Sequence, residues 1–139
     1  MQQEDINTIL AIEEATTGKR TKELEDTANF LLEHGDPHST LVAELDGKMV
    51  GFIIGERKLW EFGVSQETGW IKSLGVYPDY QGRGVGIALG NALLEHYRSI
   101  GIKVVRTLVD WHDPLTHYFR HLGFEISSQV ALELSIKED

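Results

Sequence analysis

Apolar residues in the first quarter of the chain recur at helical spacing. A first helix is predicted to begin at Asp5, whose carboxylate can cap it, because the next apolar positions are three and four residues apart. These positions are Ile6, Ile9 and Leu10. The same spacing returns at Leu24, Ala28, Leu31 and Leu32. It predicts a second amphipathic helix over residues 21–34, and the glycine, aspartate and proline that follow end it.

The pattern then changes to extended segments. Residues 41–45 and 49–56 flank Asp46 and Gly47, a pair that readily adopts the positive φ angles of a tight hairpin turn. Two antiparallel strands are therefore predicted. A loop over residues 58–67 separates them from a further strand, which is predicted over residues 70–77 because this segment is rich in large apolar side chains.

Helix and strand signals alternate in the second half of the chain. A helix is predicted from Val85 to Ile100, and Gly101 is placed to close it. Residues 103–109 follow as a predicted strand.

Asp113 and Pro114 indicate the start of a short helix, because Asp caps helices and Pro is tolerated at the first helical position. This helix is predicted to end near His121. Two closing strands are predicted over residues 124–126 and 130–136. The order of elements is typical of an α/β protein, and a length of 139 residues fits one domain spanning the chain, 1–139.

Charge and composition exclude several classes of protein. Acidic residues outnumber basic ones by 22 to 13, giving a formal net charge of −9 and no general attraction to nucleic acid. A cationic or amine partner suits this charge, although an acidic surface also simply keeps a protein soluble. The chain has no cysteine, which excludes disulfides, thiolate metal sites and a cysteine nucleophile.

No segment predicts a membrane span or a signal peptide. The longest apolar stretches, such as residues 49–54, are far too short to cross a bilayer. Residues 1–6 lack a basic segment followed by an apolar one. The sequence therefore predicts a soluble, cytoplasmic protein that binds neither membranes nor nucleic acid.

The segment with the clearest chemical signal is WIKSLGVYPDYQGRGVGIALGN, residues 70–91, in which a predicted strand leads into a glycine-rich turn and then a helix. Free backbone N–H groups and the positive end of the helix dipole meet at such a helix start, which suits a pyrophosphate. Gly82, Gly84 and Gly86 allow a ligand to approach the backbone closely. Arg83 can add a positive charge.

Other glycine-rich motifs fit this segment less well. A dinucleotide-binding fingerprint needs a third glycine three positions after the second, where this chain has Ile87. A P-loop needs Gly followed by Lys and Ser or Thr, and the segment lacks that run. Glycines that only form a tight turn remain the structural alternative.

Three motifs resemble the GNAT superfamily of N-acetyltransferases. Residues 81–86, QGRGVG, match its Arg/Gln-x-x-Gly-x-Gly/Ala signature and follow a strand of the expected type. Residues 122–124, Leu-Gly-Phe, resemble the motif that closes the family's last helix. Asp46 and Gly47, followed by Val-Gly-Phe at residues 50–52, resemble its central hairpin. The resemblance covers about residues 41–124.

The resemblance implies a mixed, mostly antiparallel sheet flanked by helices. The family's fold normally opens with a β-strand, yet only residues 1–4 precede Asp5, so the first strand is expected to be short or missing. Either the chain is part of a longer protein, or a second copy covers the exposed sheet edge in a homodimer.

The resemblance also implies a site for acetyl-coenzyme A (acetyl-CoA) as co-substrate. Leu74, Gly75 and Val76 are expected to pair by their backbone with its pantetheine arm, and the Val76 N–H to hold the thioester oxygen. The pyrophosphate is expected at the glycine-rich turn and helix start: Gln81, Gly82, Arg83, Gly84, Val85, Gly86, Ile87 and Ala88. The implied activity is transfer of the acetyl group to an amine of a small molecule or protein, without a metal.

Acetyl transfer to an amine needs a base that takes the amine proton and benefits from an acid near the leaving sulfur. Relatives often carry a tyrosine where this chain has Phe119, so the adjacent Tyr118 is the candidate acid, with packing against the sheet as the alternative. His112 stands where many relatives have an Asn facing the cofactor and is a candidate base or hydrogen-bond donor. Further candidate bases are carboxylates near the predicted strands: Glu67, Glu56 and Asp110.

Two other functions remain open. Phe119 and Lys72 stand where relatives often carry catalytic groups, which allows a non-catalytic module that binds coenzyme A (CoA) or acyl-CoA as a sensor. A dinucleotide-binding domain rests only on two glycines of the turn. His117 and His121 have the spacing of a helical metal site, but no acidic partner accompanies them, so no metal site is expected.

Overall fold

The computed structural model describes residues 3–18, 22–36, 38–59, 67–109 and 113–136. Two helices open the chain, three strands follow, and a helix, a short strand and a last helix complete it. The element bounds are α1 Gln3–Thr17, α2 Lys22–His34, β1 Thr40–Leu45, β2 Lys48–Lys58, β3 Thr68–Val76, η2 Pro78–Tyr80, α3 Val85–Ser99, β4 Val105–Arg106 and α4 Leu115–His121.

The strands form one sheet in the order β1-β2-β3-β4. The first three are antiparallel neighbours, and β4 runs parallel to β3. Asp46 (φ 52°) and Gly47 (φ 78°) make the β1–β2 turn, as predicted, because a hairpin this tight needs residues that accept positive φ. The predicted α/β fold with a mixed, mostly antiparallel sheet is confirmed.

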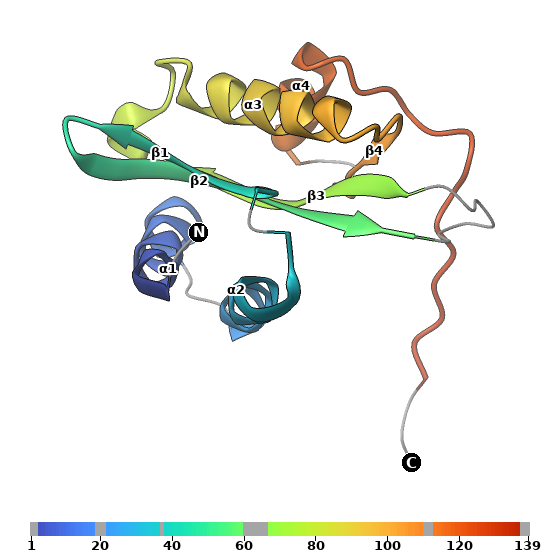
Figure 1. Cartoon of the computed structure of the whole chain (residues 1–139), viewed down its shortest axis with the longest axis horizontal. Coiled ribbons are helices and arrows are strands. Elements are labelled where there is room, and N and C mark those ends of the chain that lie inside the picture. The colour runs from blue at the N-terminus through green and yellow to red at the C-terminus, as the bar shows by residue number, and fades with distance from the viewer. Residues whose placement is uncertain (1–2, 19–21, 37, 60–66, 110–112, 137–139) are drawn as a thin grey trace.

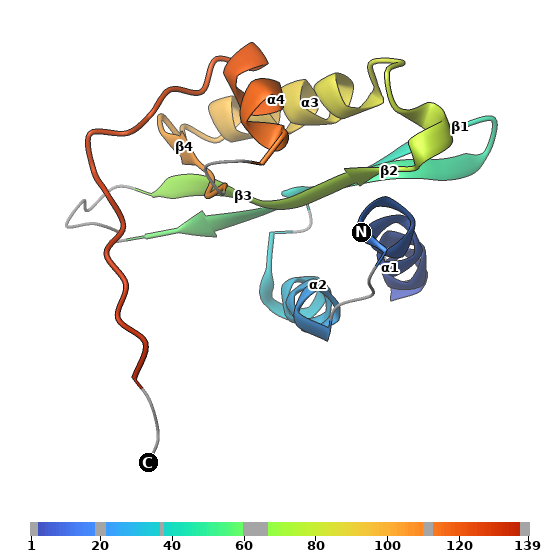
Figure 2. The same ribbon diagram turned by 180° about the vertical axis from the view of Figure 1, so that it is seen from behind.

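Helices cover both faces of the sheet, α1 and α2 on one side and α3 and α4 on the other (Figure 1). The view from behind shows the same three layers (Figure 2). Each face has its own apolar core, and Phe52 and Ile53 of β2 belong to different ones because successive side chains of a strand alternate. Ile9 of α1 lies in the first core and Leu93 of α3 in the second, both fully buried.

Tyr97 fixes α3 to the sheet close to the place where β3 meets β4. Its hydroxyl donates a hydrogen bond to the Trp70 carbonyl at 2.8 Å. Gly69 leaves room for the ring, since a Cβ added there would lie 2.7 Å from the tyrosine Cε2. Both contacts hold α3 at one height above β3.

Two strand predictions for the second half of the chain are wrong. The strand predicted over residues 103–109 is reduced to Val105–Arg106, because only these residues pair with β3. The closing strands predicted over residues 124–126 and 130–136 do not form, because no strand of the described chain lies alongside them. Their apolar side chains stay exposed, from 73% at Ile126 to 93% at Leu132.

At the other end, α1 begins at Gln3, the first described residue, so no strand precedes it within the described ranges. β1 consequently forms one edge of the sheet. None of the described helices combines the length and apolar character that a bilayer crossing requires.

A hydrogen-bonded network around Asp36 joins the α2–β1 connection to α3 and β2. Oδ2 of Asp36 lies 2.9 Å from His96 Nε2 and accepts a hydrogen bond from the Ser39 hydroxyl at 2.9 Å. Arg57 Nε lies 3.5 Å from the same oxygen, and the His38 N–H donates to Oδ1 at 2.9 Å. Burial by itself would raise the pKa of Asp36, but the hydrogen bonds and the Arg57 charge outweigh it and lower the pKa to about 2.

We expect Asp36→Asn to lower the free energy of unfolding by about 1–3 kcal/mol at neutral pH, the usual cost when a charged hydrogen-bonding group is lost and its partners stay unsatisfied. The pKa of Asp36 falls from 3.8 to about 2 on folding, so its ionised form stabilises the protein above pH 3.8. That contribution is lost as the pH falls from 3.8 towards 2. Urea unfolding at neutral and acidic pH should therefore show a difference from the wild type that shrinks in acid.

Asp26→Asn removes the same charge from an exposed position of α2 and is the matched control for this prediction. It should change the free energy of unfolding by less than about 0.5 kcal/mol. A deficit of Asp36→Asn that stays constant through the acidic range would contradict the role assigned to the carboxylate charge.

Candidate active site

β3 and β4 separate after a short paired stretch. Their pairing is confined to Gly69 with Val105 and Trp70 with Arg106. The next contact is made by a side chain, the Thr107 hydroxyl, which donates to the Ile71 carbonyl at 3.0 Å. Beyond it, the edge of β3 that faces away from β2 has no strand partner among the described residues. Such an edge presents backbone groups with which an extended ligand can pair.

A β-bulge in β3 contributes to this separation. Ile54 and Gly55 of β2 are consecutive, but they lie opposite Ser73 and Ile71, so Lys72 is an extra residue on β3. A bulge bends its strand and increases the local twist. β3 is therefore turned away from β4 just after the two strands stop pairing.

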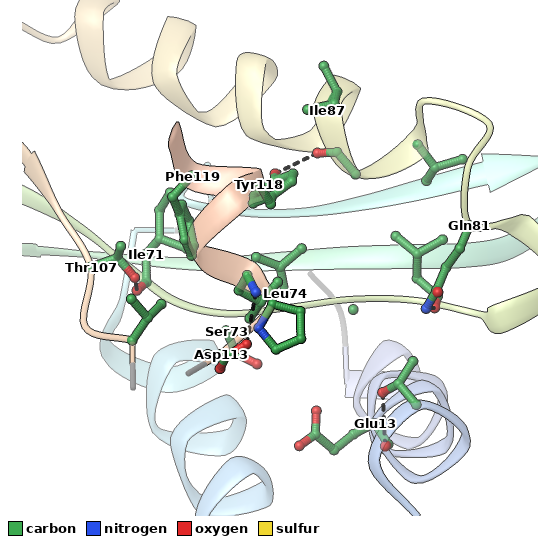
Figure 3. Close-up of a pocket in the computed structure, with 18 of the residues that line it drawn as sticks. Glu13, Ile71, Ser73, Leu74, Gln81, Ile87, Thr107, Asp113, Tyr118 and Phe119 are labelled. Atoms are coloured by element: carbon green, nitrogen blue, oxygen red, sulfur yellow. Dashed lines mark hydrogen bonds between the residues drawn. The ribbon is translucent and has the colours of Figure 1, made fainter. Parts of the chain in front are cut away.

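A cavity of about 850 Å³ extends from the separated strands to the N-terminus of α3 (Figure 3). Its walls come from α1, β3, the glycine-rich turn, α3, the segment after β4, and α4. Most of the predicted cofactor residues line it: Leu74, Gly75, Val76, Gln81, Gly82, Gly84, Val85, Gly86 and Ile87.

The backbone groups of Val76 face this cavity. The Tyr77 N–H donates to Val50 on β2 at 2.9 Å, and successive residues of a strand direct their backbone groups to opposite edges. Those of Val76 therefore point away from β2. Accordingly, the Val76 carbonyl accepts a hydrogen bond from the Gln81 side chain at 3.0 Å. The Val76 N–H is thus directed to a ligand in the cavity.

The glycine-rich turn brings free N–H groups to the other end of the cavity. Gly82 and Gly84 have φ angles of 78° and 83°, which residues with a Cβ adopt only under strain. α3 follows, and within the described chain the N–H groups of Val85, Gly86 and Ile87 have no backbone acceptor. With the positive end of the helix dipole, they suit an anionic group such as a pyrophosphate.

Two predicted cofactor residues lie outside the cavity lining, and a third lines it but has a different contact from the one expected. Arg83 does not line the cavity, and its guanidinium lies over the Tyr80 ring, 5.4 Å from the centroid. Ala88 does not line it either, and its N–H is already bonded to the Gly84 carbonyl at 3.0 Å. Gln81 does line the cavity, but its amide group holds the backbone of Val76. It orients the turn through that bond.

α4 places both Tyr118 and Phe119 in the cavity wall, and Phe119 is also buried in the core (Figure 3). The Tyr118 hydroxyl donates to the Gly86 carbonyl at 2.6 Å, and burial raises its pKa to about 12. This tyrosine therefore stays protonated at neutral pH. Phe119, at the position where relatives often have tyrosine, is only 4% exposed and packs edge-on against Phe124.

Glu67, another predicted catalytic residue, is not brought to Tyr118. Glu67 immediately precedes β3, at the end opposite Val76, where it forms an ion pair with Arg57 at 3.2 Å and does not line the cavity. His112 and Asp110 lie outside the described residues. Within the described ranges, no three potential His, Cys, Asp or Glu ligands gather closely enough to hold a metal ion.

A carboxylate that is missing from the predicted set, Glu13 of α1, lines the same cavity (Figure 3). Its neighbour Ile12 packs against Gly75, where an added Cβ would lie 3.1 Å from the isoleucine Cγ2, so α1 holds Glu13 beside β3. The half-buried carboxylate has no hydrogen-bond or ion-pair partner among the described residues, and burial raises its pKa above the ordinary 4.5. Glu13 follows Ile6 and Ile9 at helical spacing, so it lies on the buried face of α1. An acidic residue on that face is the sequence signal that could have identified Glu13 as a site residue.

Separated strands, a free strand edge and a helix start with free N–H groups meet around one cavity of this α/β fold, an arrangement that suits an extended anionic ligand such as an acyl-CoA. The chain belongs to the acetyltransferase (GNAT) family, whose model matches residues 6–124.

Named acetyltransferases are similar to this chain in sequence. An L-2,4-diaminobutyric acid acetyltransferase of Nocardia farcinica is 35% identical over 108 residues, which cover 74% of this chain and 54% of the relative. A mycothiol acetyltransferase of Propionibacterium freudenreichii is 31% identical over 110 residues, covering 75% of this chain and 33% of the relative. The chain thus spans about half, or less, of the length of these curated relatives.

Solved structures share the fold. AAC(6')-Iy in complex with the bisubstrate analogue CoA-S-monomethyl-acetylneamine matches with a TM-score of 0.76 at 15% identity, covering 99% of this chain and 95% of that one. An acetyl transferase described as putative, from Pyrococcus furiosus, has a TM-score of 0.76 at 17% identity, with 96% and 95% covered. At such identities the likeness establishes the fold and leaves the substrate open.

We expect Gly84→Ala to weaken CoA binding, because Gly84 combines a positive φ with a place in the cavity wall. An alanine forced into this conformation costs about 1–2 kcal/mol, which a shift of the turn would relieve at the expense of the N–H groups that follow. The dissociation constant of CoA, measured by calorimetry, should rise about tenfold, equivalent to about 1.4 kcal/mol.

Gly101→Ala is the matched control, since Gly101 has a φ of 86°, equally open surroundings, and a position at the far end of α3. It should lose similar stability but keep its affinity for CoA. Equal losses of affinity in the two variants would show that the turn has no particular role in binding.

Proposed function

We propose that the protein is an acetyl-CoA-dependent N-acetyltransferase acting on an amine of a small molecule. The observation that carries this proposal is one cavity joining the free edge of β3 at Leu74 to Val76, the N–H groups at the start of α3, and the carboxylate of Glu13. The first two features suit a CoA thioester. The third suits the amine that receives the acetyl group.

The cavity matches acetyl-CoA in two places. The unpaired edge of β3 suits the amide-containing pantetheine arm, and the N–H groups of Val85, Gly86 and Ile87 suit the pyrophosphate. When bound, acetyl-CoA supplies an acetyl group activated as a thioester. The residues of the chain then have to hold that group, orient the amine and move its proton.

Glu13 provides a place for a cationic amine. In the close-up it lies on α1, across the cavity from Ile87 at the start of α3 (Figure 3). A half-buried carboxylate without a partner is unfavourable, and a protonated amine would supply the missing counter-charge. The names of the relatives from Nocardia farcinica and Propionibacterium freudenreichii refer to small molecules, which supports a small, cationic acceptor.

The amine must lose a proton before its nitrogen can attack. A lysine-like amine has a pKa of about 10.4 and is almost entirely protonated at neutral pH. Because burial raises the pKa of Glu13, this carboxylate accepts a proton more readily than an exposed one. We therefore assign Glu13 the role of general base.

Val76 and Tyr118 act on the acetyl group and the sulfur. As the N–C bond forms, negative charge develops on the thioester oxygen, and one well-placed donor such as the Val76 N–H contributes about 3 kcal/mol to its stabilisation. As the C–S bond breaks, the sulfur takes up a proton. Tyr118, protonated and held at Gly86 in the cavity wall, is the proposed donor.

Incubation of the protein with acetyl-CoA and a panel of amines tests the proposed function. The panel should contain L-2,4-diaminobutyric acid, lysine and neamine, with a peptide α-amine for comparison. We expect release of free thiol that depends on the added amine, and a mass gain of one acetyl group on a small-molecule amine. Binding of acetyl-CoA without turnover of any amine would favour the sensor function, and no binding would exclude both.

The variant Glu13→Gln should lower kcat/KM for the acceptor by about 10²–10⁴-fold, the usual contribution of a general base. In the wild type, kcat/KM should fall as the pH decreases through the raised pKa of Glu13, and this acidic limb should be missing in the variant. Steady-state kinetics across the pH range measure both effects. The affinity for CoA should not change.

A stability measurement separates this effect from damage to the fold. Because the pKa of Glu13 is raised on folding, its ionised form is disfavoured in the native state at neutral pH, so Glu13→Gln should unfold no more easily than the wild type. Glu14→Gln removes the same charge from the next, exposed position, which does not line the cavity, and should remain active. Similar losses of activity in both variants would rule out a specific role for Glu13.

A further inference from the structure

Gly90 lies inside α3, at a buried position where the helix carries no side chain. Glycine in a helix interior is less favourable than alanine, because its backbone loses more freedom on folding. A glycine at such a position usually has a reason in packing or function. The φ angle of Gly90 is not positive, so the reason is not conformational. It lies in the side chains that surround the residue.

Tyr118 of α4 and Leu122 just after this helix occupy the space beside Gly90. A Cβ added there would lie 2.5 Å from the Tyr118 hydroxyl oxygen and 2.7 Å from Leu122 Cδ1. Both distances are well below an ordinary contact between heavy atoms. The leucine methyl can turn away, whereas the hydroxyl moves only with the whole ring. Gly90 therefore leaves a recess beside α3, the Gly90 recess, which the Tyr118 hydroxyl fills.

Other contacts fix the direction of the Tyr118 ring. Its hydroxyl donates to the Gly86 carbonyl at 2.6 Å, drawn as a dashed line in Figure 3. The ring packs edge-on against Phe119, with 5.1 Å between the ring centroids. A side chain at position 90 would push the hydroxyl out of the recess and away from the Gly86 carbonyl.

The Gly90 recess also sets where the tyrosine stands in the cavity. The point that a Cβ of Gly86 would occupy lies 3.5 Å from Tyr118 Cε2 and 3.9 Å from Val76 Cγ2. The ring is therefore a near neighbour of Val76, whose N–H is the proposed donor to the thioester oxygen. Tyr118 and Gly86 line the cavity, whereas Gly90 does not. Gly90 can thus affect the reaction only through the residues packed on it.

Tyr97 provides a structural counterpart elsewhere on α3. Its ring packs on Gly69 and its hydroxyl donates to the Trp70 carbonyl, but it is only 1% exposed and does not line the cavity. That arrangement anchors a helix. Tyr118 is half-buried and faces the cavity, so its hydroxyl can also meet a bound ligand.

We propose that Gly90 is a positioning residue of acetyl transfer: because it carries no side chain, it leaves the recess that holds the Tyr118 hydroxyl for proton donation to the leaving sulfur. This role of Gly90 rests on the proposed function. A hydroxyl hydrogen rotates about its C–O bond, so the held oxygen can turn its proton from the Gly86 carbonyl to the sulfur. The sulfur keeps the electron pair of the broken C–S bond and takes that proton, and solvent then returns a proton to the tyrosine oxygen.

A double-mutant cycle between positions 90 and 118 tests the proposal. Gly90→Ala should lower kcat about 10²-fold, the loss that a catalytic group displaced by about 1 Å can cause. KM for the acceptor and the affinity for CoA should stay close to the wild-type values. Tyr118→Phe should lower kcat at least as much. Adding Gly90→Ala to Tyr118→Phe should cause no further loss, because the hydroxyl that the new methyl group displaces is already gone.

Asn91→Ala, at the next, exposed position of α3, is the matched control and should keep the wild-type kcat. Full activity of Gly90→Ala would overturn the proposal. So would an equal loss of kcat with and without the Tyr118 hydroxyl, since the alanine would then act on something other than this group.

Urea unfolding of the same variants separates a failure of this role from a failure of the proposed function. Alanine normally stabilises a helix relative to glycine, so a lower urea midpoint of Gly90→Ala reports the clash, and Tyr118→Phe should restore the midpoint. A Gly90→Ala variant that folds only together with Tyr118→Phe has the same meaning. An active wild type without this restoration would overturn the recess and leave the proposed function intact. A wild type that acetylates no amine would overturn both the proposed function and the role of Gly90, even if the midpoint is restored.

Discussion

The early separation of β3 from β4 is the constraint on which the rest of the structure depends. Pairing ends after Trp70 and Arg106, the bulge at Lys72 turns β3 away, and Tyr97 fixes α3 above the point of separation through the Trp70 carbonyl. Were the strands paired along their whole length, the edge of β3 at Val76 would be consumed by the sheet. Because they part, the edge faces a cavity instead. As a consequence, β4 has only two residues, and the sheet ends at this short strand.

The two halves of the cavity use different chemistry. Backbone groups, at Val76 and at the start of α3, face the expected positions of the thioester and the pyrophosphate, which every acyl-CoA shares. Their placement follows from strand alternation and helix geometry, so it tolerates wide variation in sequence. The proposed acceptor side is formed by side chains of α1, above all Glu13, which belong to a different element from the backbone groups of the cofactor side. This division explains how one fold is found among acetyltransferases named for different acceptors.

How much of this the sequence predicts depends on how local each feature is. The turn at Asp46 and Gly47 and the glycine-rich turn were predicted because each needs positive φ angles, and the residues at the turn itself are types that accept them. Glu13 was missed because its place in the cavity depends on Ile12 meeting Gly75, a contact between distant segments. Glu67 was considered for its position near a strand, and only the fold shows it paired with Arg57 at the far end of β3.

The closing strands failed for a related reason. The alternation of apolar residues over 130–136 predicts a strand with one buried face, but it does not indicate which part of the fold covers that face. Tight turns are the local signal that usually answers this question, but the serines of residues 127–129 form only a bend, in which the Gln129 N–H donates a hydrogen bond to the Ser127 hydroxyl oxygen at 3.1 Å. The segment therefore stays extended, and its apolar side chains remain exposed among the described residues. Which surface a strand covers is decided by contacts between distant segments, and alternation within the strand does not encode them.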